Sequence, residues 1–168
     1  MKWILIAVSV VAGLIVVVLA IGAMLPKAHV VSRSSKFNQP PQAVWDIITG
    51  PPNWRPDIQS FEQLPPRDGH RVWKEVDKHR QSIRYESIEE SPPSRLVTRI
   101  ADPTLPFGGT WTHEIQADGA GSRLTITENG EIYNPIFRFM ARYVIGYHGT
   151  LEAYLKALHD KLGDASGD

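Results

Sequence analysis

The chain has 168 residues, in which 18 Lys and Arg balance 18 Asp and Glu, and this length suits one domain or one domain with an appendage. It contains no cysteine, which excludes a disulfide scaffold, thiolate metal sites and a cysteine nucleophile. Nucleic-acid binding normally needs an excess of Lys and Arg on one face, so the balanced charge predicts no nucleic-acid partner.

The chain begins with an apolar segment from Trp3 to Leu25 that has no charged residue. A helix of this length, rising about 1.5 Å per residue, spans the roughly 30 Å hydrocarbon core of a bilayer. A signal peptide is the alternative, because Ala20–Gly22 resembles a cleavage site, but the apolar region of such a peptide rarely exceeds about 15 residues. We therefore expect residues 1–26 to be a retained single-pass anchor, in a bacterial inner membrane.

The orientation of this anchor stays open. Lys27, Arg33 and Lys36 follow the apolar segment and favour a cytoplasmic location for the rest of the chain. Short N-terminal anchors in bacteria, however, often export the domain that follows them.

The next segment is predicted to be extended and then helical. Residues 28–38 have Val and Phe among Ser and Arg, without a helical period. Pro41 suits the first turn of a helix, and apolar residues at positions 43, 44, 47 and 48 recur at helical spacing until the Gly-Pro-Pro of residues 50–52.

Alternating polar and apolar residues predict five β-strands, at residues 72–76, 82–86, 96–100, 110–115 and 123–127. Residues 65–69 before the first of these strands, and residues 91–93 and 118–121 between later ones, have the Pro, Gly, Asp and Ser that turns favour. Because these connections are short, we expect antiparallel hairpins.

The last part of the chain predicts one long helix. Asn134 is a good N-cap and Pro135 a good first-turn residue. Apolar residues then recur at three- and four-residue steps from Met140 to Leu162, and Gly163 provides a stop. The helix would have about 28 residues, against a usual mean of about 11–12. Residues 164–168 are expected to be a disordered tail.

These elements predict an α+β domain over residues 27–163. Six or seven antiparallel strands form a sheet with one face to bury, and the long amphipathic helix is the element that can cover it.

Five short motifs follow one another in this domain. They are Pro-x-x-Val-Trp-x-x-Ile, Trp-Arg-Pro-Asp, Pro-Pro-x-Arg-Leu, Phe-Gly-Gly-Thr-Trp and Thr-Glu-x-Gly, at residues 41–48, 54–57, 92–96, 107–111 and 127–130. Their order resembles the SRPBCC or START-like superfamily, and within it the polyketide cyclase/dehydrase and lipid transport group. The resemblance covers residues 28–163 and implies a helix-grip fold, in which the sheet wraps around the long C-terminal helix. It also implies a hydrophobic cavity, which different members use for lipids, sterols, polyketides or hormones.

Aromatic residues on the strands and the last helix are the predicted lining of that cavity. Trp111 and His113 have the same parity on one strand, so their side chains point to the same face. On a concave face His113 could orient a ligand carbonyl or act as an acid or base, although an aromatic core wall explains the same pattern. The predicted ligand-binding residues are Trp73, Tyr85, Trp111, His113, Phe137, Met140, Val144 and Tyr147.

No motif predicts a cofactor or a metal. The sequence has no Gly-x-Ser-x-Gly, and its six histidines form no His-x-x-x-His pair. The Asp-Gly-Ala-Gly of residues 118–121 joins two predicted strands, whereas a phosphate-binding loop opens a helix.

We predict a membrane-anchored domain that binds a hydrophobic small molecule: a lipid, an isoprenoid or a polyketide-like compound. The first alternative is a cyclase or dehydratase that uses His113 or a Tyr as acid or base. The second is a stress or assembly protein whose cavity is filled. The size and polarity of the cavity discriminate among the three, and loops 50–54 and 103–109 are either gates, bilayer contacts or plain connectors. The sequence gives no prediction of whether the protein is a monomer or an oligomer.

Overall fold

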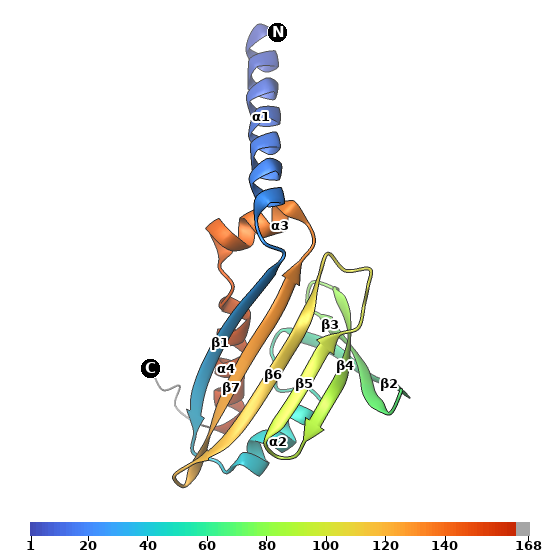
Figure 1. Ribbon diagram of the computed structural model, residues 1–168, viewed down its shortest axis with the longest axis vertical. Coiled ribbons are helices and arrows are strands. Elements are labelled where there is room, and N and C mark those ends of the chain that lie inside the picture. Colours follow the sequence, from blue (N-terminus) through green and yellow to red (C-terminus); the bar gives the residue numbers. More distant parts are fainter. Residues whose placement is uncertain (164–168) are drawn as a thin grey trace.

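The structure is a computed structural model that describes residues 1–163 (Figure 1). Its strands are β1 (Ala28–Phe37), β2 (Ile58–Arg67), β3 (His70–Asp77), β4 (Ser82–Ser91), β5 (Arg95–Ile100), β6 (Phe107–Asp118) and β7 (Gly121–Ile132). Its helices are α1 (Lys2–Met24), α2 (Pro41–Thr49), α3 (Pro135–Met140), the π-helical turn η1 (Ala141–Ile145) and α4 (Gly149–Leu162). The predicted disordered tail, residues 164–168, lies outside the described residues.

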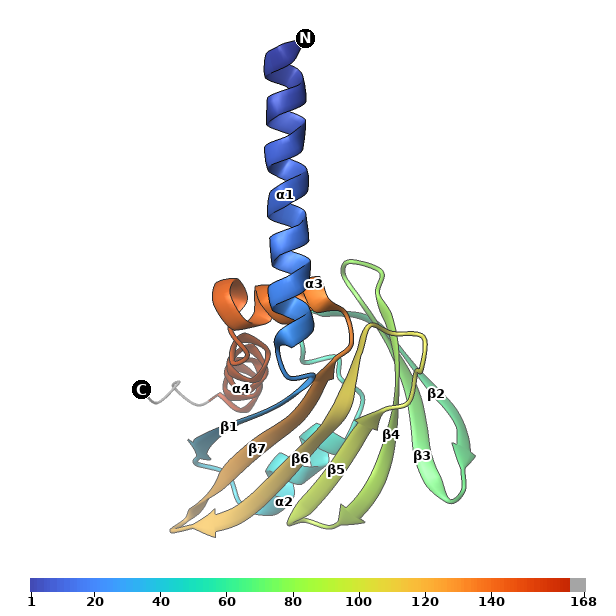
Figure 2. The same ribbon diagram turned by 45° about the horizontal axis from the view of Figure 1, so that its top comes forward.

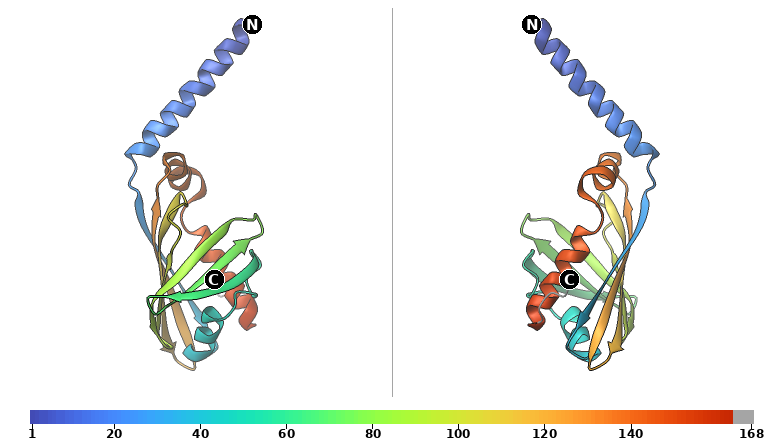
Figure 3. Two further views of the ribbon diagram at one scale, coloured as in Figure 1. Left: turned by 90° about the vertical axis from the view of Figure 1, so that its right-hand side faces the viewer. Right: turned by 90° about the vertical axis from the view of Figure 1, so that its left-hand side faces the viewer.

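The strands form one antiparallel sheet of seven strands in the order β1-β7-β6-β5-β4-β3-β2, which confirms the predicted α+β class. The hairpin of β6 and β7 is paired along its whole length, from Phe107 opposite Ile132 to Asp118 opposite Gly121. The sheet is strongly curved, and α4 and α2 lie on its concave side (Figure 3). The sheet therefore grips the last helix.

Strand β2 was not among the strands predicted from alternation. Residues 65–69 were predicted to be a turn, but Pro65 and Pro66 belong to β2 and only Asp68 and Gly69 form the turn, with φ of 51° and 83°. Proline lacks a donor for the sheet ladder, so it is tolerated on an edge strand or at a bulge. β2 is an edge strand, and its pairing with β3 shifts register between Leu64 and Arg67.

The prediction of one continuous helix from Pro135 to Leu162 is wrong. The helix begins as expected, because the Asn134 side chain accepts hydrogen bonds from the backbone N–H groups of Ile136 and Phe137 at 2.8 and 3.3 Å. It then widens into η1 and stops at Gly146, whose φ of 81° and ψ of 179° are accessible to glycine alone. The chain starts a new helix, α4, at Gly149.

The core fills only part of the space between the sheet and the helices. Leu124 and Ile126 of β7 are fully buried under α4, whereas Thr125 between them points outward and its hydroxyl is 2.7 Å from that of Ser34. This alternation fixes which face of the sheet is inside. The core consists of Val31, Phe37, Val44, Trp45, Leu96, Ile115, Leu124, Ile126, Leu151, Leu155 and Leu158.

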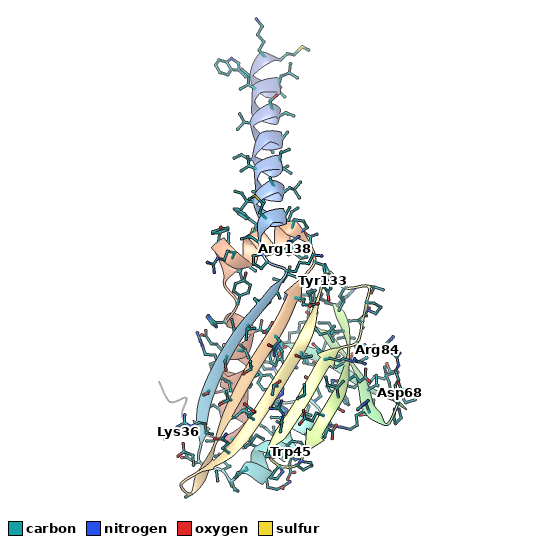
Figure 4. The ribbon with its side chains drawn as sticks, viewed as in Figure 1. Lys36, Trp45, Asp68, Arg84, Tyr133 and Arg138 are labelled. Carbon is teal, nitrogen blue, oxygen red and sulfur yellow. The ribbon has the colours of Figure 1, made fainter. Side chains whose placement is uncertain are left out.

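Helix α1 projects away from the sheet and is the one helix in residues 1–163 that is long and apolar enough to cross a membrane (Figure 2). Its side chains point outward all around it (Figure 4), and Gly22 is its only buried residue. Gly22 lies against α3, because a Cβ at this position would clash with the backbone of Pro135. Helix α1 thus meets the domain only at its last turns.

Candidate functional site

A partly open cavity of about 640 Å³ lies between the concave face of the sheet and the segment from α3 to α4. Its lining includes every predicted ligand-binding residue except Val144, which lies in η1 and is 62% exposed. The structure thus brings together Trp73, Tyr85, Trp111, His113, Phe137, Met140 and Tyr147. That these residues bind a ligand stays a prediction.

Val144 was predicted from the apolar stripe of a continuous helix, and the break in that helix explains its position. A π-helical turn changes the angular spacing of side chains, so a stripe drawn at 3.6 residues per turn no longer follows one face. Tyr147, which follows Gly146, does face the domain, where its ring stacks on His29 at 4.4 Å between centroids.

Aromatic rings from three parts of the chain meet at Tyr154, which sequence reasoning assigned only to the helical stripe. The centroid of its ring is 5.1 Å from that of Trp54 and 5.5 Å from that of Trp111, both edge-on. It is also 5.7 Å from the ring of His113. The sequence did hold a signal, because Tyr154 lies three and four residues from Leu151 and Leu158 and therefore on the face of α4 that is buried in the core.

His113 is the most deeply buried titratable group of the site, with 4% of its surface exposed. Neither ring nitrogen makes a hydrogen bond of ordinary geometry among residues 1–163, although the Leu96 backbone lies close enough to the ring to act on its pKa. Burial lowers the pKa of His113 to about 4, and the positive charge of Arg55 acts in the same direction against an opposing effect of the Leu96 backbone. The imidazole is therefore neutral at pH 7 and can both donate and accept one hydrogen bond.

An ion pair between Arg55 and Glu75, which sequence reasoning did not find, is one of the charged groups of the cavity, whose lining also includes Arg71, Asp77, Arg99, Glu128 and Glu131. The Arg55 guanidinium donates to Glu75 at 2.9 Å and to Asp57 at 2.6 Å, and the Trp73 indole N–H donates to Glu75 at 3.0 Å. Burial by itself would lower the pKa of Arg55, but the carboxylates of Glu75 and Asp57 more than offset this and raise it. Arg55 and Asp57 belong to the Trp-Arg-Pro-Asp motif. The sequence therefore showed the motif, but not the ion pair that it forms with Glu75.

Two buried tyrosine hydroxyls are further polar groups of the cavity. Burial, and next to it the negative charge of Glu75, raises the pKa of Tyr85 well above its ordinary value. Burial also raises the pKa of Tyr154, although the nearby Arg55 acts against it. Both hydroxyls are protonated at neutral pH and can donate hydrogen bonds to an oxygen of a ligand.

Both loops that the sequence analysis singled out contribute to the lining. Gly50, Pro52 and Trp54 come from the first, and Phe107, Gly108 and Gly109 from the second. Whether they move stays a prediction. Within residues 1–163, no group of three or more His, Asp or Glu side chains is placed to hold a metal ion.

Comparisons with known proteins agree on the fold. The family model described as "Polyketide cyclase / dehydrase and lipid transport" matches residues 28–163. The search of curated proteins finds no match. A solved structure from Thermus thermophilus is similar, with 19% identity, a TM-score of 0.64 and coverage of 80% of this chain and 97% of that one.

Two further solved structures show the same likeness. The protein XoxI from Bacillus cereus has 18% identity and a TM-score of 0.64, covering 80% of this chain and 96% of that one. Norcoclaurine synthase from Thalictrum flavum has 11% identity and a TM-score of 0.62, covering 82% of this chain and 88% of that one. At these identities the likeness concerns the fold alone.

Proposed function

Because the chain belongs to the polyketide cyclase / dehydrase and lipid transport family, we propose that it is a membrane-anchored domain that binds a hydrophobic small molecule in its cavity. The ligand would be a lipid, an isoprenoid or a polyketide-like compound. The observation that carries this proposal is the cavity of about 640 Å³, which is within the range of about 300–1,000 Å³ typical of ligand sites. A cavity of this size does not suit a stress or assembly protein with a filled core.

The lining supports a ligand that is mainly apolar with one polar end. Burial of apolar surface contributes roughly 25 cal/mol per Å², so the aromatic walls supply most of the affinity. The hydroxyls of Tyr85 and Tyr154 and the imidazole of His113 are neutral hydrogen-bonding groups that suit a ligand hydroxyl or carbonyl. Arg55 is already paired with Glu75, so the cavity offers no net positive charge at that point for an anionic ligand.

A cyclase or dehydratase is the second candidate, and the unpartnered imidazole of His113 beside Tyr154 favours it. A general base works best with a pKa near the working pH, and with a pKa of about 4 His113 is a weak base at pH 7. We therefore rank ligand binding first. Once a ligand is identified, turnover that His113→Gln removes without loss of binding would reverse this order.

Native mass spectrometry of the full chain, extracted with detergent, tests the proposed function. We expect the spectrum to show the protein with an apolar compound bound, and release of that compound identifies its class. A mass of the protein alone, together with no binding of fluorescent fatty-acid or isoprenoid probes, would contradict the proposal.

A pair of threonine variants tests whether the cavity is the site. Thr98 lines the cavity on β5, so Thr98→Phe should fill part of it and weaken probe binding by about tenfold or more, as expected when about 1.4 kcal/mol of binding energy is lost. Thr112→Phe is the matched control, because Thr112 pairs with Thr127, whose hydroxyl contacts Ser32 on the outer face. Equal binding by both variants would place the ligand elsewhere.

A further inference from the structure

The segment from Tyr133 to Ile145 carries six exposed large apolar side chains in three groups, separated by half-buried residues and the buried Arg138. Val144 and Ile145 are 62% and 74% exposed, and Tyr143 is 59% exposed. Water-soluble domains rarely leave large apolar side chains so exposed in a group, and such groups mark surfaces that contact something else. The apolar docking surface, as we call it, consists of Tyr133, Ile136, Phe137, Tyr143, Val144 and Ile145.

This surface is held directly against the end of the apolar helix α1. Arg138 of α3 is buried and donates hydrogen bonds to the carbonyl oxygens of Leu25 and Ala23, at 2.7 and 3.4 Å (Figure 4). These carbonyls belong to the C-terminal turn of α1, where the backbone carbonyl oxygens have no N–H donor within the helix. Arg138 therefore caps α1, and the close packing of Gly22 on Pro135 holds the two helices together.

The position of α1 limits how far this surface can lie from a membrane. If α1 crosses the bilayer, its last turn ends at the headgroup layer, because the helix is about as long as the hydrocarbon core is thick. Helix α3 contacts that last turn, so it lies within about one helix diameter, roughly 10 Å, of the membrane surface.

Part of the exposed lining of the cavity lies at the same place. Phe137 and Ile145 line the cavity, and they are also 48% and 74% exposed, so they form part of its mouth. Met140 and Ala141, which lie between them in the chain, line the cavity as well. This part of the mouth and the apolar docking surface are thus made by the same segment, α3 and η1.

The composition of this segment suits the interface of a bilayer better than a protein partner. Tyr133 and Tyr143 are amphipathic rings of the kind that gather at the headgroup level. Lys27 and Arg142 are exposed nearby in the chain and can attract anionic phospholipids. The acidic residues that flank this segment in the chain are Glu131, which accepts a hydrogen bond from the Tyr133 hydroxyl, and Glu152, which accepts one from Arg33.

We propose that the apolar docking surface lies in the headgroup layer of the membrane that α1 spans, so that the mouth of the cavity opens onto the bilayer. The occupant of the surface is the lipid bilayer itself, and the ligand of the cavity exchanges with it without crossing water. This inference rests on the proposed anchor and deepens the proposed function.

Site-directed spin labelling of the full chain in phosphatidylethanolamine and phosphatidylglycerol vesicles tests the proposal. The chain has no cysteine, so Val144→Cys gives a single labelled site, and Val144 is outside the cavity lining. Lys36→Cys is the water-exposed control, because Lys36 lies near the far end of β1 from α1 (Figure 4). Leu14→Cys, in the middle of α1, is the control for the bilayer interior.

We expect the label at position 144 to be more accessible to oxygen and less accessible to a water-soluble nickel chelate than the label at position 36. Equal accessibility at positions 144 and 36 would overturn docking, and spin–spin broadening at position 144 would do so by showing contact between two copies. A water-exposed label at position 14 would overturn the anchor and docking together. None of these readouts requires a bound ligand, so their failure is distinct from failure of ligand binding.

Discussion

His113 combines burial with two unpartnered ring nitrogens among the described residues, and this makes the stability of the protein depend on pH. Unfolded, the imidazole binds a proton with a pKa near 6.5, whereas in the folded chain burial lowers the pKa to about 4. Between these values the unfolded state binds more protons, so the free energy of unfolding falls as the pH falls from 6.5 to 4. The total decrease in the free energy of unfolding is about 3 kcal/mol, and there is no such decrease above pH 6.5.

We therefore expect His113→Gln to remove most of the His113-linked loss of stability between pH 6.5 and 4, measured by thermal unfolding of the detergent-solubilised chain. His79→Gln is the control, because His79 is exposed in the turn between β3 and β4 and its side chain makes no hydrogen bond among the described residues. The interpretation fails if the His113 variant keeps the pH dependence of the native chain.

The ion pair of Arg55 and Glu75 should show strong coupling. Their side chains are 18% and 9% exposed, so removal of Arg55 leaves the Glu75 carboxylate with little water around it, and removal of Glu75 leaves Arg55 paired with Asp57 alone. Arg55→Met or Glu75→Leu should each cost about 3 kcal/mol, whereas the double variant should cost less than the sum by about 2 kcal/mol. Urea unfolding of the native chain, the two single variants and the double variant measures this coupling energy.

The matched comparison is the exposed pair of Lys156 and Asp160, whose side chains are 68% and 62% exposed on α4. A double-mutant cycle on this pair should give a coupling energy of at most about 0.5 kcal/mol, because water and salt screen the attraction between the two charges. Similar coupling in both cycles would show that burial of Arg55 and Glu75 does not set their interaction.

Individual site residues were predictable where strand parity decides direction, as for Trp111 and His113. The partners of these residues were not, because Arg55, Glu75 and Tyr154 meet across separate parts of the chain. No local spacing relates Arg55, which follows α2, to Tyr154 on α4, although the guanidinium lies 5.6 Å from the centre of the tyrosine ring. Such contacts depend on the curvature of the sheet.

Among the elements, the break between η1 and α4 decides the shape of the cavity mouth, and it depends on one glycine. Gly146→Ala should cost about 1–3 kcal/mol in stability, because its backbone conformation is one that residues with a Cβ rarely adopt. Gly149→Ala is the matched control: Gly149 begins α4 with open space around it, so alanine should be neutral or stabilising by up to about 1 kcal/mol. Equal effects in thermal unfolding would show that Gly146 is not what holds the break.

The same two elements show why some of the fold could not be predicted. Asn134 and Gly163 mark helix ends by local chemistry, and both boundaries were predicted correctly. The break at Gly146 lies inside a stripe of apolar residues, and an isolated glycine is common within helices. Likewise Pro65 and Pro66 indicate a turn unless the strand is known to be at an edge, which only the assembled sheet determines.

For the molecule as a whole, the contact between α1 and α3 predicts that the N-terminal helix is kept. A signal peptidase needs an accessible, extended site, but Gly22, at the end of the candidate site Ala20–Gly22, is buried against Pro135. We expect the mass of the protein from membranes to include residues 1–22 and its extraction to require detergent. A detergent-free fraction that lacks these residues would show cleavage.

Only Leu25, Pro26 and Lys27 join α1 to β1, and even fully extended they reach about 10 Å. Hydrogen bonds from Arg138 to Leu25 and from the Ile132 N–H to the Lys27 carbonyl shorten that reach further. If α1 spans a membrane as proposed, so short a tether would keep the domain at that membrane instead of letting it travel to a second one. A ligand would then reach the domain by lateral diffusion in two dimensions and would leave it through the same membrane.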